Sequence, residues 1–438
     1  MSHDPLYQRP AELLQNLIRF DTTNPPGNEA ACLAYLAGLL GDAGIPSTFY
    51  ARTPERPNLV ARLPGEGRAA PILLYGHVDV VTTAGQRWSR PPFAAESADG
   101  FIWGRGALDM KGGVAMLVAA VLRARAEGAR LPGDVVLALV SDEEAGGDFG
   151  AKFLVEQHAG LFAGIRYALG EFGGFSLHIA GRRFYPIMVA EKQLCALKAI
   201  VRGPAGHGSL SARGGAMARL ARMLERLDRR RLPVHVTPPA RLMFERLAAA
   251  LPGAAGLLLR QLLNPALTDS VLDVLGERGR VFDPLLHNTA NPTMLQASDK
   301  INVIPAEVSV GLDGRLLPGF TPADMLAELR PVLGDDVEVE VVRYDPGPAT
   351  MDLGLFDLLA EVLRQADPAG APTPLLLSGV TDGRFFARLG IQTYGFLPMK
   401  LPADFNFAGV IHGADERVPA DAIAFGANAI YNVLQRLT

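Results

Sequence analysis

Apolar residues follow two alternating patterns over the first 190 residues of the chain. Three segments have the three-to-four-residue apolar spacing of a helix: "PAELLQNLIRF", "EAACLAYLAGLLGDAG" and "KGGVAMLVAAVLRARAEG". Two compact apolar runs, "ILLYGHVDVV" and "DVVLALVS", are typical of strands buried on both faces. The same style returns after about residue 350, with helices at "LFDLLAEVLRQA" and "DAIAFGANAIYNVLQRL" and a strand at "IQTYGF". We therefore expect an α/β fold in which helices cover a mixed sheet.

The middle of the chain has a different order of elements. A strand at "LCALKAIVRG" is followed by a helix at "GGAMARLARMLERLDRR" and by strands at "TMLQAS" and "AEVSVGLDGRL". A helix at "TPADMLAELRPVL" and a strand at "VEVEVVR" complete the series. This order predicts an α+β, ferredoxin-like sandwich, interrupted by a helical stretch at about 240–285. We expect residues 191–347 to form a domain inserted into a larger one made of residues 1–190 and 348–438.

Composition and charge narrow the classes of partner. The 438 residues carry a net charge of −4 with acidic and basic residues mixed, which gives no electrostatic basis for nucleic-acid binding. Cys32 and Cys195 are far apart and rule out a disulfide framework or a cysteine-rich metal site. The longest apolar run, residues 247–259, is too short to cross a membrane, and no secretory signal is visible. We expect a cytoplasmic protein with neither a nucleic acid nor a membrane as partner.

The motifs "GHVDVV" and "WGRGALDMKGG" each contain one candidate metal ligand, His77 and Asp109. In "GHVDVV", His77 and Asp79 are two residues apart, so they point to the same side of an extended chain. A neutral imidazole is a good metal ligand, and a carboxylate beside it can fix its tautomer; the alternative is a structural histidine at a strand end. In "WGRGALDMKGG", Asp109 follows a glycine-rich loop and precedes a helix. It is either a ligand or simply a helix N-cap.

Further acids and a histidine follow other apolar segments. Asp142, Glu143 and Glu144 stand in "SDEEAGG", Glu171 ends "YALGE", and His412 lies in "IHGADERVP". Strand ends in a covered sheet border the ligand crevice. Two histidines with three or four carboxylates suit divalent cations, which would also make a cluster of ionised acids tolerable. The pattern therefore predicts a divalent-metal site, with one carboxylate able to bridge two ions.

Seven motifs in order resemble one family. "GHVDVV", "GRGALDMKGG", "SDEEAGG", "GEFGG", "GHGS", "NVIPAE" and "HGADE" are similar to the di-zinc aminoacylase and carboxypeptidase family of metallopeptidases. That family includes acetylornithine deacetylase, succinyl-diaminopimelate desuccinylase, glutamate carboxypeptidase and carboxypeptidase-S-like enzymes. The resemblance runs from about residue 12 to residue 436, and the length and helical stretch look most like the carboxypeptidase-S-like members. It implies a catalytic metal-binding domain and an inserted lid and dimerisation domain.

The resemblance also implies a division of roles among the acids and histidines. Two zinc ions per subunit, replaceable by Co²⁺ or Mn²⁺, would be held by five ligands: His77 and Glu171 on one ion, Glu144 and His412 on the other, and Asp109 on both. The Asp109–Met110 peptide is expected to be cis. Glu143 would be the general base and Asp79 would lie behind His77. Asp142 has no catalytic role by this resemblance, and we expect it to hydrogen-bond within the loop or face solvent.

Three further motifs concern the substrate. By resemblance, His207 in "GHGS" supplies an imidazole to the reacting carbonyl, in dimers from the neighbouring subunit, and Asn302 in "NVIPAE" hydrogen-bonds substrate. Taken alone, each would be a turn residue. In "SGVTDGRFFARLG", Arg384 would contact a substrate carboxylate, which its planar guanidinium suits, while Gly379 would let the backbone approach the ligand.

These features predict a zinc-dependent hydrolase that cleaves an amide bond in a short peptide or an N-acyl amino acid with a free carboxylate. The alternatives are an N-carbamoyl or ureido amidohydrolase and an acetylornithine-type deacetylase. A non-catalytic binding homologue is disfavoured because every expected ligand and Glu143 are present. A homodimer formed through the inserted domain is expected from the same resemblance.

Overall fold

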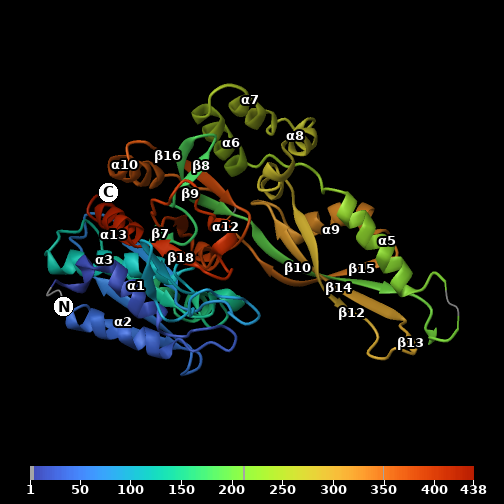
Figure 1. Ribbon diagram of the computed structural model, residues 1–438, viewed down its shortest axis with the longest axis horizontal. Helices are drawn as coiled ribbons and strands as arrows, with labels where there is room; N and C mark the ends of the chain where they lie inside the picture. The colour runs from blue at the N-terminus through green and yellow to red at the C-terminus, as the bar shows by residue number, and fades with distance from the viewer. Residues whose placement is uncertain (1–3, 211–212, 349) are drawn as a thin grey trace. The chain divides into compact units, whose positions relative to one another are not determined.

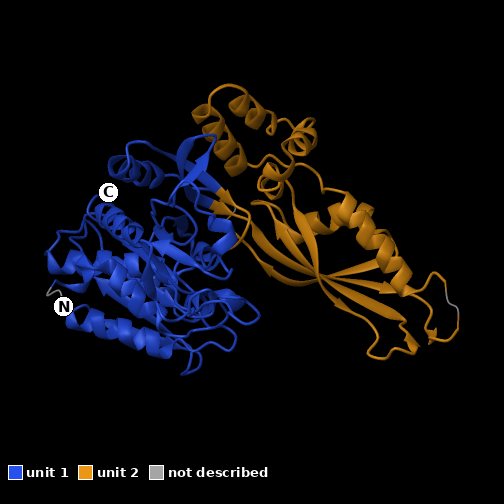
Figure 2. Ribbon diagram, in the orientation of Figure 1, with its two compact units in different colours: residues 1–189, 351–375, 381–438 blue, residues 190–350, 376–380 orange. Residues whose placement is uncertain are grey.

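The chain divides into two compact units (Figure 2). The computed structural model describes residues 4–210, 213–348 and 350–438. Unit 1 consists of residues 1–189, 351–375 and 381–438, and unit 2 of residues 190–350 and 376–380. The apolar pattern gave residues 376–380 to the larger domain, whereas their contacts are with unit 2. The backbone N–H of Lys192, for example, donates to the Leu377 carbonyl at 3.0 Å.

A nine-stranded mixed sheet forms the centre of unit 1 (Figure 1). The strands lie side by side in the order β1, β2, β6, β3, β7, β17, β9 and β16, and β8 pairs with β9. Neighbours β6, β3, β7 and β17 are parallel, whereas β1 with β2, β2 with β6 and β17 with β9 pair antiparallel. The bounds are β1 Ser47–Ala51, β2 Pro57–Leu63, β3 Ile72–His77, β6 Val135–Val140, β7 Tyr167–Gly170, β8 Leu177–Ile179, β9 Arg182–Glu191, β16 Gly370–Leu377 and β17 Gln392–Gly395.

Both faces of this sheet are buried under helices, which explains the unbroken apolar runs. On β3, Ile72 and Leu74 enter one hydrophobic core, while Leu73 and Tyr75 enter another on the opposite face. The first core includes residues of α1, α2, α3, α10 and α13, and the second includes residues of α4 and α11. The helices of unit 1 are α1 Pro10–Ile18, α2 Ala30–Asp42, α3 Lys111–Ala126, α4 Ala151–Gln157, α10 Phe356–Ala366, α11 Gly383–Phe386, α12 Phe407–Val410 and α13 Ala420–Leu434. A small sheet of β4 Glu96–Ala98, β5 Phe101–Trp103 and β18 Arg417–Pro419 completes it.

Unit 2 contains an antiparallel sheet of four strands in the order β12, β14, β10 and β15. Apolar residues of α5 and α9 pack on this sheet, as Leu220, Met325 and Leu197 show by sharing one core. The helical stretch expected near 240–285 is present between α5 and β12. The bounds are β10 Gln193–Arg202, β11 Gly206–His207, α5 Ala216–Arg229, α6 Pro238–Ala250, α7 Gly253–Gln261, α8 Thr268–Leu275, β12 Thr289–Gln296, β13 Val303–Ile304, β14 Glu307–Leu316, α9 Pro322–Leu333 and β15 Val337–Asp345.

The predicted fold class is confirmed, since the larger sheet is mixed and helices cover it. None of the helices in the described part of the chain combines the length and apolar character that crossing a lipid bilayer requires.

Gly170, the last residue of β7, tests this packing. A Cβ atom at this position would lie 2.0 Å from the ring of Tyr75 on β3, far inside van der Waals contact. We expect Gly170→Ala to lower the free energy of unfolding by about 1–3 kcal/mol, the usual cost of overpacking a core. Thermal unfolding followed by circular dichroism measures this change.

Gly38 in α2 provides the matched control, because a Cβ there meets no atom of the residues that the structure describes within 4 Å. Gly38→Ala should leave the stability unchanged or raise it by up to about 1 kcal/mol, as expected for glycine in a helix. Equal stability of the Gly170→Ala variant and the wild-type protein would show that the contact between β7 and Tyr75 is not tight.

Candidate functional site

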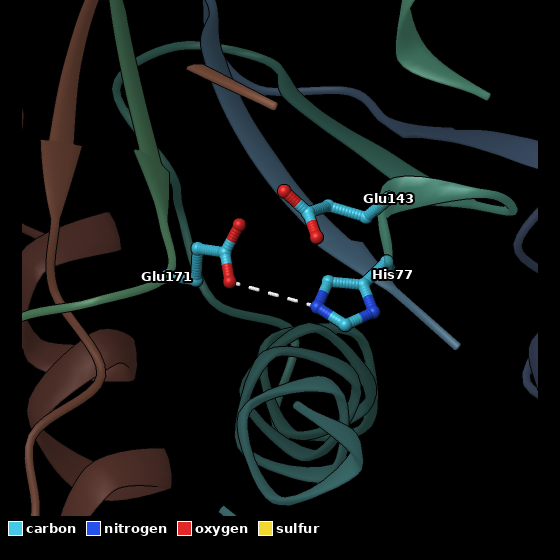
Figure 3. Close-up of side chains that lie close together, drawn as sticks. All are labelled: His77, Glu143 and Glu171. Carbon is cyan, nitrogen blue, oxygen red and sulfur yellow. Dashed lines mark ion pairs between the residues drawn. The ribbon is translucent and has the colours of Figure 1, made fainter. Parts of the chain in front are cut away.

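Polar residues stand at or directly after the ends of three neighbouring parallel strands of unit 1. β3 ends at His77, β7 is followed directly by Glu171, and β6 leads through a short turn to the single helical turn Glu143–Ala145. Because β6, β3 and β7 are adjacent and parallel, their carboxyl ends meet at one edge of the sheet. Figure 3 shows the side chains of His77, Glu143 and Glu171 pointing toward one common space.

Asp109 lies between the two histidines of the site. Its Oδ1 is 3.1 Å from His77 Nε2, and its Oδ2 is 3.0 Å from His412 Nε2. Each imidazole also faces a glutamate: Glu171 Oε2 is 3.5 Å from His77 Nε2, and Glu144 Oε2 is 3.4 Å from His412 Nε2. The arrangement therefore has two halves joined by one carboxylate. The Asp109–Met110 peptide bond is cis, as the resemblance implied.

The donor set of this cluster fits divalent cations. Ligand atoms of His77, Asp109 and Glu144 lie within 4.8 Å of one another, and the same holds for His77, Glu143 and Glu171. Oε1 of Glu144 and Oε1 of Glu171 are buried and have no hydrogen-bond partner among the described residues. Buried carboxylate oxygens are normally satisfied by donors, so these two oxygens need a cation or a proton.

The pKa values of these groups in the protein without metal ions show how poorly the cluster tolerates ionised acids. Burial raises the pKa of Glu144 to about 7 and raises the pKa of Glu171 well above its usual value. Hydrogen bonds that the His412 ring donates to the carboxylates of Asp109 and Glu144 raise its pKa to about 10. Burial disfavours a charged His77, but its contacts with Asp109, Asp79 and Glu171 outweigh burial and raise its pKa. Bound protons thus supply the positive charge that metal ions would supply in their place.

His77 is held in the orientation that a ligand requires. Its Nδ1 lies 3.0 Å from the backbone carbonyl of Asp79, which can only accept, so Nδ1 carries a hydrogen; once Nε2 loses its proton to a metal ion, the Nε2 lone pair faces the cluster. The Asp79 carboxylate lies further away, 3.5 Å from Nδ1. That carboxylate instead accepts the backbone N–H groups of Glu143 at 3.2 Å and of Glu144 at 3.1 Å. Asp79 therefore connects the end of β3 to the turn that carries both glutamates.

Glu416 fixes the loop that presents Asp109. Its fully buried carboxylate accepts the backbone N–H groups of Gly106, Leu108 and Asp109 at 2.7–3.1 Å. It also pairs with Arg105 at 2.7 Å, and the same guanidinium donates to the His412 carbonyl at 3.1 Å. One buried ion pair therefore braces both the joining carboxylate and the second histidine.

Arg384 lies inside unit 1 rather than on an open surface. Only 3% of its side chain is exposed, and its guanidinium donates to the carbonyls of Thr381 at 2.6 Å and Gly146 at 3.3 Å. Its Nη1 is also 3.7 Å from Oε1 of Glu143. Gly379 belongs to unit 2, and among the described residues a Cβ there would meet Leu377 alone, at 3.9 Å, so this packing does not demand glycine.

His207 and Asn302 lie together in unit 2. The two-residue strand that ends at His207 pairs with the strand that follows Asn302, and the Asn302 carbonyl accepts the Gly208 N–H at 2.8 Å. Both side chains are exposed. The Ser209 N–H donates to Nδ1 of His207 at 3.2 Å, which places the proton of a neutral ring on Nε2. The exposed face of the imidazole is therefore a hydrogen-bond donor.

Sequence reasoning missed two buried residues of this region. Glu416 is the last letter of "HGADE", a motif in which only the histidine attracted notice. Asn24 stands before two prolines and has the signature of an ordinary turn, yet its side chain contacts both Asp79 and Asp142. An acid four residues after His412 in the same motif was a usable signal for Glu416, whereas nothing in the local pattern singled out Asn24.

Comparisons with known proteins identify a family and several relatives. The model of the peptidase family M20/M25/M40 matches residues 73–436. "Probable carboxypeptidase S-like 2" of Dictyostelium discoideum is 29% identical over 80% of this chain and 68% of its own length. The human "N-fatty-acyl-amino acid synthase/hydrolase PM20D1" is 28% identical over 83% of this chain and 74% of its own length.

A solved structure supports the fold over the whole chain. The M20 family metallo-carboxypeptidase Sso-CP2 from Sulfolobus solfataricus superposes with a TM-score of 0.71 at 17% identity, covering 99% of both chains. The family match extends over most of the chain and includes every residue of the candidate metal cluster, namely His77, Asp109, Glu143, Glu144, Glu171 and His412. The chain therefore belongs to the peptidase family M20/M25/M40, and it is a metal-dependent hydrolase of amide bonds.

Proposed function

We propose that this hydrolase uses two zinc ions per subunit to cleave the amide bond of a short peptide or an N-acyl amino acid that has a free carboxylate. The observation that carries this proposal is the placement of Asp109, whose two oxygens face two different histidines. Each histidine has its own glutamate, so the set divides evenly into ligands for two ions. Two ions bridged by one carboxylate are a recurring arrangement in hydrolases.

Glu143 is the general base in this proposal. When bound, the zinc pair polarises the scissile carbonyl and lowers the pKa of the attacking water. Glu143 takes the proton from that water and returns it to the leaving nitrogen. Burial raises the pKa of Glu143 above its usual value, which makes its carboxylate a stronger base toward that water. Glu143 lies close enough to His77 and Glu171 to ligate. Among the three glutamates of the cluster, however, Glu144 and Glu171 are the two with a buried oxygen that has no hydrogen-bond partner in the described residues.

The family resemblance assigns the substrate carboxylate to Arg384. Its guanidinium lies 3.7 Å from the proposed base, but only 3% of the side chain is exposed, so a substrate carboxylate has to replace its contacts with the Thr381 and Gly146 carbonyls. The relatives named as carboxypeptidase S-like and as a hydrolase of N-fatty-acyl amino acids both fit this substrate class. Exposed His207, with its donor face, is proposed to stabilise the negative charge that develops on the carbonyl oxygen.

A substrate panel tests this function. Dipeptides, N-acyl amino acids, N-carbamoyl amino acids and N-acetylornithine are incubated with the zinc-loaded protein, and release of the free amine is measured. We expect turnover of dipeptides or N-acyl amino acids and loss of turnover when the carboxylate is amidated. Hydrolysis of the N-carbamoyl compounds alone would replace the proposal by a ureido amidohydrolase, and of N-acetylornithine alone by a deacetylase.

A homodimer through unit 2 is also part of the proposal. β12 is an edge strand of the four-stranded sheet, carries no charged residue, and exposes 65% of Met294 and 57% of Leu295. The opposite edge strand, β15, contains Glu338 and Glu340, and such charges discourage pairing between edges. β12 is therefore the edge we assign to pairing with a second copy.

Replacing Glu143 should separate catalysis from metal binding. Glu143→Gln keeps the size of the side chain but removes the base, so we expect kcat to fall by about 100- to 10,000-fold. Zinc content, measured by atomic emission, should stay at the wild-type value. Glu156→Gln, an exposed carboxylate on α4, is the control and should keep full activity. Near-wild-type activity in the Glu143→Gln variant would remove it from its role.

Metal stoichiometry should respond to each half of the cluster separately. After treatment with a chelator, the wild-type protein should have a lower Tm, regain it with zinc, and bind two equivalents, because ligands stabilise the folded state. His412→Ala should bind one equivalent tightly, since His77 and Glu171 remain in place. His178→Ala on β8 is the control and should still bind two. Tight binding of two equivalents by the His412→Ala variant would contradict the ligand assignment.

The edge-strand assignment predicts a change of oligomeric state. Leu295→Lys adds a charge to β12 and should convert a dimer into a monomer in analytical ultracentrifugation, whereas Val342→Lys on β15, 65% exposed at this position, should not. If His207 acts across the dimer, the Leu295→Lys monomer should lose activity while keeping its zinc. A fully active monomer would exclude a contribution from the partner subunit.

A further inference from the structure

Hydrogen bonds between residues 22–24 and residues 78–80 hold Asn24 next to the end of β3. Its N–H donates to the Val80 carbonyl at 2.9 Å, and the Val80 N–H donates to the Thr22 carbonyl at 3.1 Å. The Thr22 hydroxyl donates to the Val78 carbonyl at 2.6 Å. Residues 22–24 therefore run alongside the segment just after His77, and the Asn24 side chain is only 4% exposed.

The side-chain amide of Asn24 joins two carboxylates. Its Nδ2 donates to Oδ2 of Asp79 at 2.8 Å and to Oδ1 of Asp142 at 3.2 Å. A primary amide has two hydrogens, so each carboxylate can receive one. The two acids follow different strands, β3 and β6, and Asn24 is a polar side chain that bonds to both.

Each of these carboxylates controls part of the proposed active centre. Asp79 carries the carbonyl that orients His77, and its carboxylate accepts the N–H groups of Glu143 and Glu144. Asp142 immediately precedes the base, adopts a left-handed backbone conformation with φ of 72°, and closes its turn by accepting the Phe149 N–H at 3.0 Å.

The guanidinium of Arg56 balances the negative charge of the carboxylates near the Asn24 side chain. Arg56 pairs with Asp142 at 2.9 Å and with Glu29 at 2.6 Å, and all three side chains are buried. In the described part of the chain Arg56 forms ion pairs with Asp142 and Glu29 but not with Asp79, so Asn24 is the neutral donor through which Asp79 and Asp142 share a buried network. An aspartate at position 24 would add a further carboxylate instead of a donor, and a leucine would keep the shape but donate nothing.

We propose that Asn24 is a positioning residue of the active centre: by bonding to Asp79 and Asp142 at once, it sets the placement of His77 relative to Glu143 and Glu144. This inference rests on the proposed two-zinc site. Hydrogen bonds behind metal ligands commonly change metal affinity or activity by about 10- to 100-fold when they are removed.

The test compares Asn24→Leu and Asn24→Asp with Thr22→Val. Thr22→Val removes one buried hydrogen bond from the same segment but touches neither carboxylate, so it is the matched control for a purely structural role. Zinc affinity is measured by competition with a chromophoric chelator, Tm by thermal unfolding with and without zinc, and kcat and KM on the best substrate of the panel.

For both Asn24 variants we expect zinc affinity and kcat to fall by about 10- to 100-fold, with KM little changed. Thr22→Val should lower Tm and leave zinc affinity and kcat at wild-type values. The inference is overturned if Asn24→Leu binds zinc and turns over substrate like the wild-type protein, or if Thr22→Val loses as much of both.

A smaller variant guards against misfolding. Should the first two variants fail to fold, Asn24→Ser retains a single donor and is judged by the same criteria against Thr22→Val. Zinc affinity needs no substrate, so it decides the role of Asn24 even if the wild-type protein hydrolyses nothing in the panel. A wild-type protein that hydrolyses no substrate of the panel would contradict the proposed function but not the role of Asn24.

Discussion

The constraint on which unit 1 depends is the electrostatic cost of holding several carboxylates together out of water. Asp79, Asp109, Glu144 and Glu171 are largely buried within a few ångströms of two imidazoles. Like charges in such a space repel, and burial penalises each ionised form, so the cluster persists only with positive charge among the ligands. The surrounding framework is organised to tolerate this cost, since each acid is tied to backbone N–H groups, imidazoles or guanidinium groups at fixed positions.

That framework works through three adjacent parallel strands and the turns that follow them. The Asp79 carboxylate ties the end of β3 to the turn after β6, and Glu416 ties the loop of Asp109 to the segment of His412. Neither acid faces the candidate metal cluster as a proposed ligand, yet each fixes the position of residues that do. The three consecutive acids in "SDEE" therefore have three different sets of contacts: Asp142 closes the turn, Glu143 faces Arg384, and Glu144 faces His412.

Much of this arrangement was predictable because it depends on local pattern. Unbroken apolar runs predicted strands covered on both faces, and polar residues at their ends predicted a site at one sheet edge. What the pattern did not contain was contact between distant positions. Asn24 bonds to partners 55 and 118 residues away, and a lone asparagine before two prolines predicts only a turn. The burial of Arg384 against Glu143 was missed for the same reason, since an arginine after a glycine-rich turn normally predicts an accessible cation.

The strand order of the larger sheet has a consequence for how the chain is made. β17 lies between β7 and β9, although some 200 residues separate it from them in the sequence, and its last residue, Gly395, pairs with Gly170 beside Glu171. During synthesis from the N-terminus, β7 is complete long before its neighbour leaves the ribosome, and all of unit 2 is translated in between. The edge of β7 that pairs with β17, next to Glu171, therefore stays unpaired through most of translation. β17 is the last strand to join this sheet.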